Sequence, residues 1–325
     1  MESELPHAQQ SLSDCVVLVP THNRHANLDV STQYFAQTGI PVLYVDSTRE
    51  KYKNAENLCP NIKYFHRPGL EFAQKMLSIS NEMDAFDYVV QCADDDFVLF
   101  SGVEKARSFL RKNPSFVSVR GRSLCFIKEL PGRFFDTFNN NVVRKVEAST
   151  SRERVQSYFC DYADIFYAMY PSQKLKKFYS LMAEVEFSNY QWYELFFGTV
   201  MAAEGKMAFL DFLWNVREFL WKPSWSYGEK LKRVIPWENM EDPLIQQDFS
   251  RAKELIFREY GEDLFSNMLD SFLRCNARYH QRSLVKKILG KKFLPYAKLL
   301  KYGMLSKKHS VFGVDVLPVV RALWG

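Results

Sequence analysis

The sequence of 325 residues lacks the features of a membrane-spanning or exported protein. Hydrophobic residues make up 47% of it, yet no long uninterrupted apolar run occurs, so we expect no transmembrane helix. The first twenty residues contain no Lys or Arg, whereas a secretory signal begins with basic residues followed by an apolar stretch. The sequence therefore favours a cytoplasmic protein.

The chain is also poor in cysteine and lacks any C-x-x-C pair. Its six cysteines are widely and irregularly spaced, at Cys15, Cys59, Cys92, Cys125, Cys160 and Cys275. This spacing argues against a zinc site and against a disulfide framework. We expect reduced thiols, as is usual in the cytosol.

Acidic residues are almost absent from the end of the chain. Residues 271–325 contain twelve Lys or Arg and one acid, a net charge of +11, whereas the preceding 270 residues carry a net charge of −6. Such a basic tail indicates a polyanionic partner, either membrane lipid head groups or nucleic acid.

Short apolar runs alternate with helical stretches in the first hundred residues. The expected strands cover residues 15–19, 40–45, 62–65 and 88–92, and the expected helices cover about 28–37 and 70–83. Strands alternating with helices predict an α/β fold, with a mostly parallel central sheet and helices on both faces.

The rest of the chain is less regular. We expect a strand at 116–119, irregular or antiparallel structure at 123–150, aromatic-rich helices at 151–205, a late strand pair at 207–214 and amphipathic helices at 244–275. The predicted domains are a disordered leader (1–14), a catalytic-type domain (15–220) and a helical extension with the basic tail (221–325).

Polar clusters follow three of the expected strands, beginning at Thr21, Asp46 and Asp94. Because ligands bind beyond the carboxyl ends of parallel strands, these clusters are expected to converge on one crevice. Adjacent carboxylates at Asp94, Asp95 and Asp96 repel one another unless a cation is near, which indicates a divalent metal. The alternative is a solvated acidic turn that caps the next helix.

These segments resemble family 2 glycosyltransferases of the GT-A fold. Val16-Val-Leu-Val-Pro-Thr-His-Asn-Arg24 resembles the opening of that family, 42–47 its second strand, and 88–97 its D-x-D strand. Tyr193-Glu-Leu195, Gly205-Lys206 and 209–217 resemble its later W-E-L…G-K…Y-R stretch. The resemblance covers roughly residues 15–218.

The resemblance implies a nucleotide-sugar donor and a metal. Thr21 and Asp46 would contact the base and ribose, and an Asp carboxylate can accept the imino N–H of uracil, which favours a UDP-sugar. Asp94, Asp95 and Asp96 would hold Mn²⁺ or Mg²⁺ on the diphosphate. The other donor-binding candidates are Pro20, Asn23, Arg24, Lys75 (with Arg67 as a weaker choice) and Arg217.

An inverting transferase also needs a general base for the acceptor hydroxyl. The family's usual E-D pair is missing before the W-E-L stretch, so we select Glu194, with Glu186 second and Glu184 third. Glu194 could instead be a helix-surface residue paired with a lysine. His22 replaces a common Tyr and is not assigned a role.

The basic tail offers two interpretations. Residues 284–308 alternate apolar pairs with lysine pairs, as do segments that lie on an anionic membrane. The segment could equally pack on the body with its lysines in solvent. We expect no nucleic-acid binding, because no recognised motif accompanies the charge.

The leading hypothesis is a metal-dependent glycosyltransferase, inverting by resemblance, that acts on a saccharide or lipid-linked saccharide in cell-surface polysaccharide synthesis. It would sit in the cytoplasm or at the inner face of the membrane. One alternative is a nucleotidyltransferase, against which Pro20–Arg24 lacks a glycine-rich phosphate loop. Another is an inactive scaffold of the same fold docked at a membrane.

Overall fold

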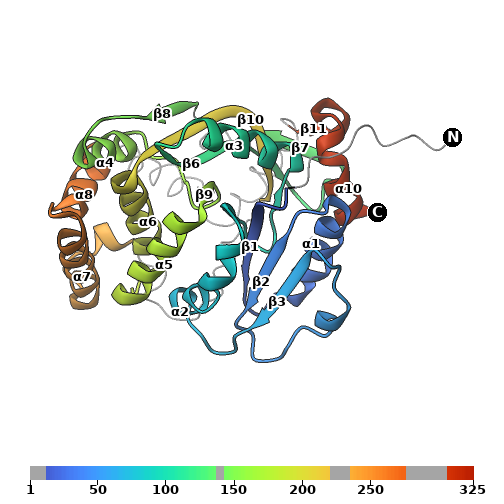
Figure 1. The fold of residues 1–325 in the computed structure, drawn as a ribbon, viewed down its shortest axis with the longest axis horizontal. Helices are drawn as coiled ribbons and strands as arrows, with labels where there is room; N and C mark the ends of the chain where they lie inside the picture. The colour runs from blue at the N-terminus through green and yellow to red at the C-terminus, as the bar shows by residue number, and fades with distance from the viewer. Residues whose placement is uncertain (1–11, 137–142, 220–234, 276–305) are drawn as a thin grey trace, which may run out of the picture.

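The computed structural model describes residues 12–136, 143–219, 235–275 and 306–325. Four parallel strands in the order β3-β2-β1-β4 form one half of the sheet. They are β1 (Cys15–Thr21), β2 (Val42–Asp46), β3 (Ile62–His66) and β4 (Tyr88–Gln91). All four end on the same edge, which positions their following loops together (Figure 1).

The other half of the sheet is mixed. It contains β5 (Phe97–Val98), β6 (Phe116–Phe126), β7 (Arg133–Asp136), β8 (Arg144–Val146), β9 (Met169–Pro171), β10 (Lys206–Glu218) and β11 (Lys307–Lys308). The antiparallel strand β9 joins β4 to β6, and β10 runs parallel to β6. The described residues thus form one sheet of eleven strands.

Helices cover both faces of this sheet, because the central strands are apolar on both sides. On β1, Val16 and Leu18 belong to one core cluster, while Val17 and Val19 belong to the other. The second cluster includes side chains of α1 (His25–Thr38), α3 (Phe100–Lys112) and α10 (Leu317–Trp324).

The first cluster packs under the remaining helices. These are α2 (Phe72–Leu77), α4 (Ser151–Cys160), α5 (Ser172–Val185), α6 (Tyr190–Glu204), α7 (Pro243–Tyr260) and α8 (Leu264–Cys275). Figure 1 shows α7 and α8 at the end of the molecule away from β3. Short 3-10 helices lie at Ala55–Asn57, Ser80–Ala85, Pro236–Glu238, His309–Phe312 and Val314–Val316.

The predicted α/β class, with a parallel central sheet and helices on both faces, is confirmed. Two element predictions were wrong. The helix expected at 70–83 is two pieces, α2 and the 3-10 helix Ser80–Ala85, and the strand pair expected at 207–214 is the single strand β10. β10 stays continuous because β6 pairs with it along most of its length, a tertiary contact that local sequence does not reveal.

The prediction of reduced cysteines was wrong for one pair. A disulfide joins Cys160, at the end of α4, to Cys275, at the end of α8, across a sequence separation of 115 residues. The spacing along the chain concealed it, because only the packing of α8 on α4 brings the two Cα atoms to 4.8 Å. Cys15, Cys59, Cys92 and Cys125 carry free thiols.

Both described ends of the chain contact the sheet domain. Leu12 is buried, and Asp14 pairs with Arg107 and Arg111 on α3, whereas residues 1–11 lie outside the described residues. Near the other end, Val319 and Ala322 of α10 join the core cluster that contains α1. No helix in the described ranges has the length and apolarity needed to cross a bilayer.

The segment expected to bind membranes falls mostly beyond what can be described. Residues 284–305 lie outside the described residues, and Lys307–Lys308 form β11, which pairs antiparallel with β7. Both lysines are exposed on that strand.

Candidate functional site

A cavity of about 430 Å³ lies beyond the carboxyl ends of β1 and β4. It is the crevice that the fold class predicts. Nine of the residues selected from the sequence line it, namely Pro20, Thr21, Arg24, Lys75, Asp94, Asp95, Asp96, Glu194 and Arg217. The strand-end clusters after β1 and β4 therefore do converge, and α6 and β10 complete the enclosure.

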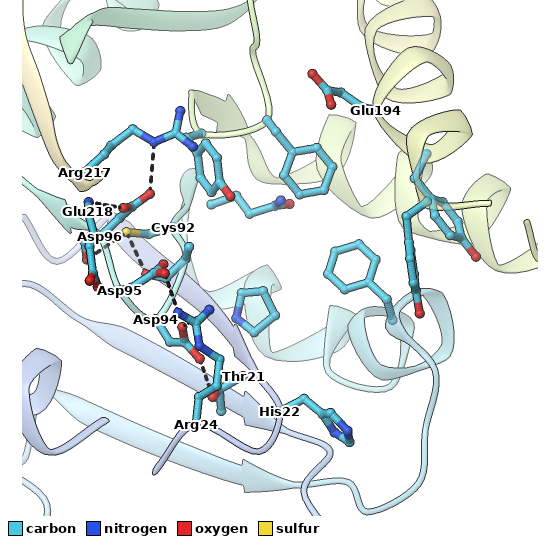
Figure 2. Close-up of a pocket in the computed structure, with 18 of the residues that line it drawn as sticks. Thr21, His22, Arg24, Cys92, Asp94, Asp95, Asp96, Glu194, Arg217 and Glu218 are labelled. Atoms are coloured by element: carbon cyan, nitrogen blue, oxygen red, sulfur yellow. Dashed lines mark hydrogen bonds and ion pairs between the residues drawn. The ribbon is translucent and has the colours of Figure 1, made fainter. Parts of the chain in front are cut away.

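Two arginines bracket the aspartate run, which we define as Asp94–Asp96. Arg24 lies 2.9 Å from Asp94 and also pairs with Asp95. At the other end, Arg217 Nε lies 3.1 Å from Asp96. Figure 2 shows the two guanidinium groups at opposite ends of the run. Each of the three carboxylates thus pairs with an arginine, which reduces the repulsion among their like charges.

Further hydrogen bonds fix the outer carboxylates. Thr21 donates its hydroxyl to Asp94 Oδ2 at 2.6 Å, and Asn27 donates to Oδ1 at 3.2 Å. The backbone N–H of Glu218 donates to Asp96 Oδ1 at 3.1 Å. These bonds tie the ends of β1, β4 and β10 to one another through the aspartate run.

Burial dominates the ionisation of these carboxyl groups. It raises the pKa of Asp94 to about 6 despite the opposing charge of Arg24. It raises the pKa of Asp96 to about 7 despite Arg217. The protein by itself therefore disfavours ionisation of Asp94 and Asp96, because it removes these two carboxylates from water without supplying enough positive charge.

Lys75 reaches the site from α2. It is 2% exposed, and its Nζ donates to the Thr21 carbonyl at 2.8 Å and to Ser47 Oγ at 3.2 Å. Burial lowers the pKa of Lys75 to about 8. The ammonium group therefore fixes the end of β1 and the loop after β2 by hydrogen bonds. Arg67, the weaker choice from the sequence, is not among the lining residues.

Glu194 enters the cavity from α6. Figure 2 shows it on a different side of the cavity from the aspartate run. The Tyr162 hydroxyl donates to its Oε1, and no described residue donates to its Oε2. Burial, reinforced by the charge of Asp164, raises the pKa of Glu194 to about 7. A carboxyl group tuned in this way can accept a proton near neutral pH.

Sequence reasoning missed Asp164, which lies in the loop between α4 and β9. Its Oδ2 lies 3.2 Å from Arg217 Nη1, and its Oδ1 accepts from the Phe166 N–H at 2.7 Å. The buried Arg120 donates to the Asp164 carbonyl and so holds this loop in place. The segment was expected to be mostly helical, and no local signal marked this residue as part of the site.

Aromatic side chains line another part of the cavity. Phe72, Phe166, Tyr190 and Tyr193 form what we call the aromatic wall. Phe72 packs against Phe166 and Tyr193 with ring centroids 5.9 and 6.2 Å apart. We call the opposing group of Arg24, Asp94, Asp95, Asp96, Arg217 and Glu218 the charged wall.

Three selected residues do not line the cavity. Asp46 is fully buried and accepts hydrogen bonds from the Thr48 N–H and the Tyr64 hydroxyl, and it pairs with His25. Asn23 is exposed in the left-handed region, with φ 56°. Glu186, also exposed, accepts from Gln74 at 2.9 Å. The third choice for the base, Glu184, pairs on the surface with Arg258.

The lining residues fit a cation that is shared with a ligand better than one held by protein alone. Among the described residues, no group of three or more His, Cys, Asp or Glu side chains is arranged as a metal site. The cavity nevertheless offers six carboxyl groups against three Lys or Arg side chains. Hard cations such as Mg²⁺ are commonly held by one or two carboxylates together with substrate phosphates.

Comparison with known proteins finds likeness among solved structures alone. No protein-family model and no curated protein matches the sequence. Among solved structures, CMP:2-keto-3-deoxy-manno-octonic acid synthetase complexed with CTP is similar, with a TM-score of 0.37 and 11% sequence identity. The likeness covers 62% of this chain and 90% of that one. At this TM-score the likeness carries no conclusion about the chemistry of the present chain.

Proposed function

We propose that the protein is a cation-dependent glycosyltransferase that moves a sugar from a nucleoside diphosphate to a saccharide hydroxyl. One observation carries the proposal: the aspartate run and the buried Glu194, from segments about a hundred residues apart, line the same cavity. A transferase needs both a site for the diphosphate and a base for the acceptor, and the charged wall and Glu194 would supply them.

The charged wall would bind the diphosphate. Arg24 and Arg217 present guanidinium groups that suit phosphate oxygens, and Asp94–Asp96 would hold a shared Mg²⁺ or Mn²⁺. The cavity has more carboxyl groups than Lys or Arg side chains, so a diphosphate without a cation would be repelled. This excess supports the proposal of a bound cation. The cation would offset the charge on the departing diphosphate.

Glu194 would act as the general base. The acceptor oxygen bonds to the anomeric carbon while the bond from that carbon to the diphosphate oxygen breaks. The hydroxyl proton passes to the Glu194 carboxylate, whose Oε1 is held by Tyr162. Attack from the side opposite the leaving group inverts the anomeric carbon.

Calorimetry with UDP, GDP, CDP and TDP, each with and without Mn²⁺, tests the donor site. We expect one nucleotide to bind only with the cation, and the D94N/D96N variant to bind none. The enzymatic test follows nucleoside diphosphate release from the matching nucleotide sugar in the presence of saccharide acceptors. Absence of binding by every nucleotide would overturn the proposal and favour a scaffold.

The nucleotidyltransferase alternative has a separate readout. Such an enzyme would consume a nucleoside triphosphate and a sugar substrate and release pyrophosphate. Pyrophosphate release from CTP or UTP with sugar phosphates, and none of the diphosphate release described above, would establish that alternative instead.

A further inference from the structure

Gln91, the last residue of β4, is a buried polar group in an apolar setting. Side chains alternate across a strand, and on β4 Val89 packs in the cluster under α5 and α6, whereas Val90 packs in the cluster with α1 and α3. Gln91 therefore points to the same side as Val89. It is inaccessible to solvent and yet lines the cavity.

One end of the Gln91 amide is fixed and the other has no partner. The Tyr179 hydroxyl of α5 donates to Gln91 Oε1 at 2.6 Å. The Nε2 group is buried, and within the described ranges no protein group accepts a hydrogen bond from it. Tyr179 is itself fully buried, so it orients the amide and leaves the N–H donors directed elsewhere.

An amide donor buried without a partner is costly, so such groups in native proteins are matched to an acceptor. The carboxylates of the charged wall are already engaged by Arg24, Arg217 and Thr21. A ligand oxygen in the cavity is the acceptor that the position of Gln91 suits.

We propose that Gln91 is a specificity-determining residue whose Nε2 donates to a hydroxyl oxygen of the sugar being transferred. This inference rests on the proposed function. Gln91 lies three residues before Asp94 of the charged wall, on the face of the sheet covered by α5 and α6, and α6 carries Glu194. In a transfer reaction the sugar lies between the diphosphate and the base, which is where these two groups of residues meet.

The consequence is selectivity among sugars. A site that hydrogen-bonds a substrate hydroxyl rejects an analogue without it, because its own buried donor is left unpaired. The aromatic wall can contact the apolar face of a sugar ring but does not distinguish hydroxyl positions. Gln91 would therefore select by the presence and direction of one hydroxyl.

The test compares binding of UDP with binding of UDP-glucose, UDP-galactose and UDP-N-acetylglucosamine, in the presence of Mn²⁺ and without acceptor. If the nucleotide panel selects another base, its diphosphate and sugars replace these probes. The Gln91→Met variant keeps the length of the side chain and removes the donor. Gln74→Met, on α2 and outside the cavity, is the matched control.

We expect Q91M to bind the bare nucleoside diphosphate as the unmodified protein does, and the preferred nucleotide sugar roughly tenfold more weakly, as loss of one buried hydrogen bond requires. Deoxy analogues of that sugar then identify the hydroxyl, because one analogue will bind both proteins equally. Tyr179→Phe keeps the amide and frees its orientation, so it should weaken sugar binding by less than Q91M does.

Equal weakening of diphosphate and nucleotide sugar in Q91M, or no weakening of either, would overturn the assignment. So would an effect confined to the KM for the acceptor, since the hydroxyl would then belong to the other substrate. Failure of the proposed function itself is visible earlier, because the unmodified protein would then bind no nucleotide, or would release pyrophosphate from a nucleoside triphosphate.

Discussion

The two walls of the cavity are built in different ways. The charged wall comes from the ends of β1, β4 and β10, and each of its residues lies within a few positions of a strand end. The aromatic wall comes from α2, α6 and the loop after α4, so most of its residues lie on helices. Strand ends converge by topology, whereas the helices meet only through packing.

This difference teaches where binding and selectivity reside. The charged wall is held by ion pairs and hydrogen bonds of 2.6 to 3.2 Å that connect three strands. The aromatic wall is an extension of the hydrophobic core that packs under α5 and α6. Changes in the first should abolish binding of the diphosphate, and changes in the second should weaken contact with the sugar or the acceptor.

The largest effect is expected from removing the carboxylates of the charged wall. The D94N/D96N variant should lose cation-dependent nucleotide binding and reduce transfer on the order of 10⁴-fold, because several kcal/mol of charge stabilisation are lost. Calorimetry with Mn²⁺ measures the binding, and circular dichroism checks the fold. Unchanged binding in the folded variant would separate the charged wall from nucleotide recognition.

Glu194→Gln is expected to reduce transfer on the order of 10³-fold, as loss of a general base does. Nucleotide binding should stay unchanged, since Glu194 lies on a different side of the cavity from the aspartate run. Glu186→Gln, exposed and outside the cavity, is the matched control and should transfer normally. If E186Q and E194Q exchanged these results, the assignment of the base would be wrong.

The pH dependence of transfer sharpens the same assignment. Burial raises the pKa of Glu194 to about 7, and a base works only when deprotonated, so the rate should rise with pH through about 7 and then level off. Tyr162→Phe removes a hydrogen bond that lowers this pKa, so its profile should move to higher pH. A profile that stays in place would exclude Glu194 as the titrating group.

A smaller effect is expected at the aromatic wall. Phe72→Ala should weaken binding of the nucleotide sugar or raise the KM for the acceptor by about 10-fold, because ring contacts contribute of the order of 1 kcal/mol. Binding of the bare nucleoside diphosphate should not change. Phe257→Ala, whose ring is 57% exposed on α7, is the control. Weaker binding of the diphosphate in F72A would remove the distinction between the walls.

The disulfide should matter for stability and least for chemistry. The C160S/C275S variant should unfold more easily by about 2–4 kcal/mol, because the bridge closes a long loop in the unfolded chain. Denaturant titration measures this, with the exposed, free Cys59 changed to Ser as the control. Nucleotide binding at the charged wall should persist, since neither cysteine lines the cavity.

Much of the charged wall was predictable from the sequence. Buried strands read as short apolar runs, and polar residues directly after them are brought together by the parallel topology. That rule found Thr21, Arg24 and the aspartate run. It did not find Asp164, whose loop is held by Arg120 through a contact 44 residues away.

The rule also did not identify Gln91, and it predicted a place at the cavity for Asp46, which does not line it. Gln91 was read as part of an apolar strand, although one polar side chain on the inward face of such a strand is a usable signal. Asp46 follows a strand as the rule requires, but His25, Tyr64 and Thr48 occupy its carboxylate away from the cavity. The position of a residue along a strand does not show whether protein groups already bind its side chain in place of a ligand.

The α/β class, the parallel central strands and the acidic and basic groups at their ends could be predicted from the amino-acid sequence alone. These depend on periodicity and on residues close together in the chain, where local sterics and burial decide the outcome. Three properties required the folded arrangement: which carboxyl groups share the cavity, how burial shifts their pKa values, and which cysteines pair. Those properties depend on distances between segments far apart in the chain, because desolvation and Coulomb interactions act through space.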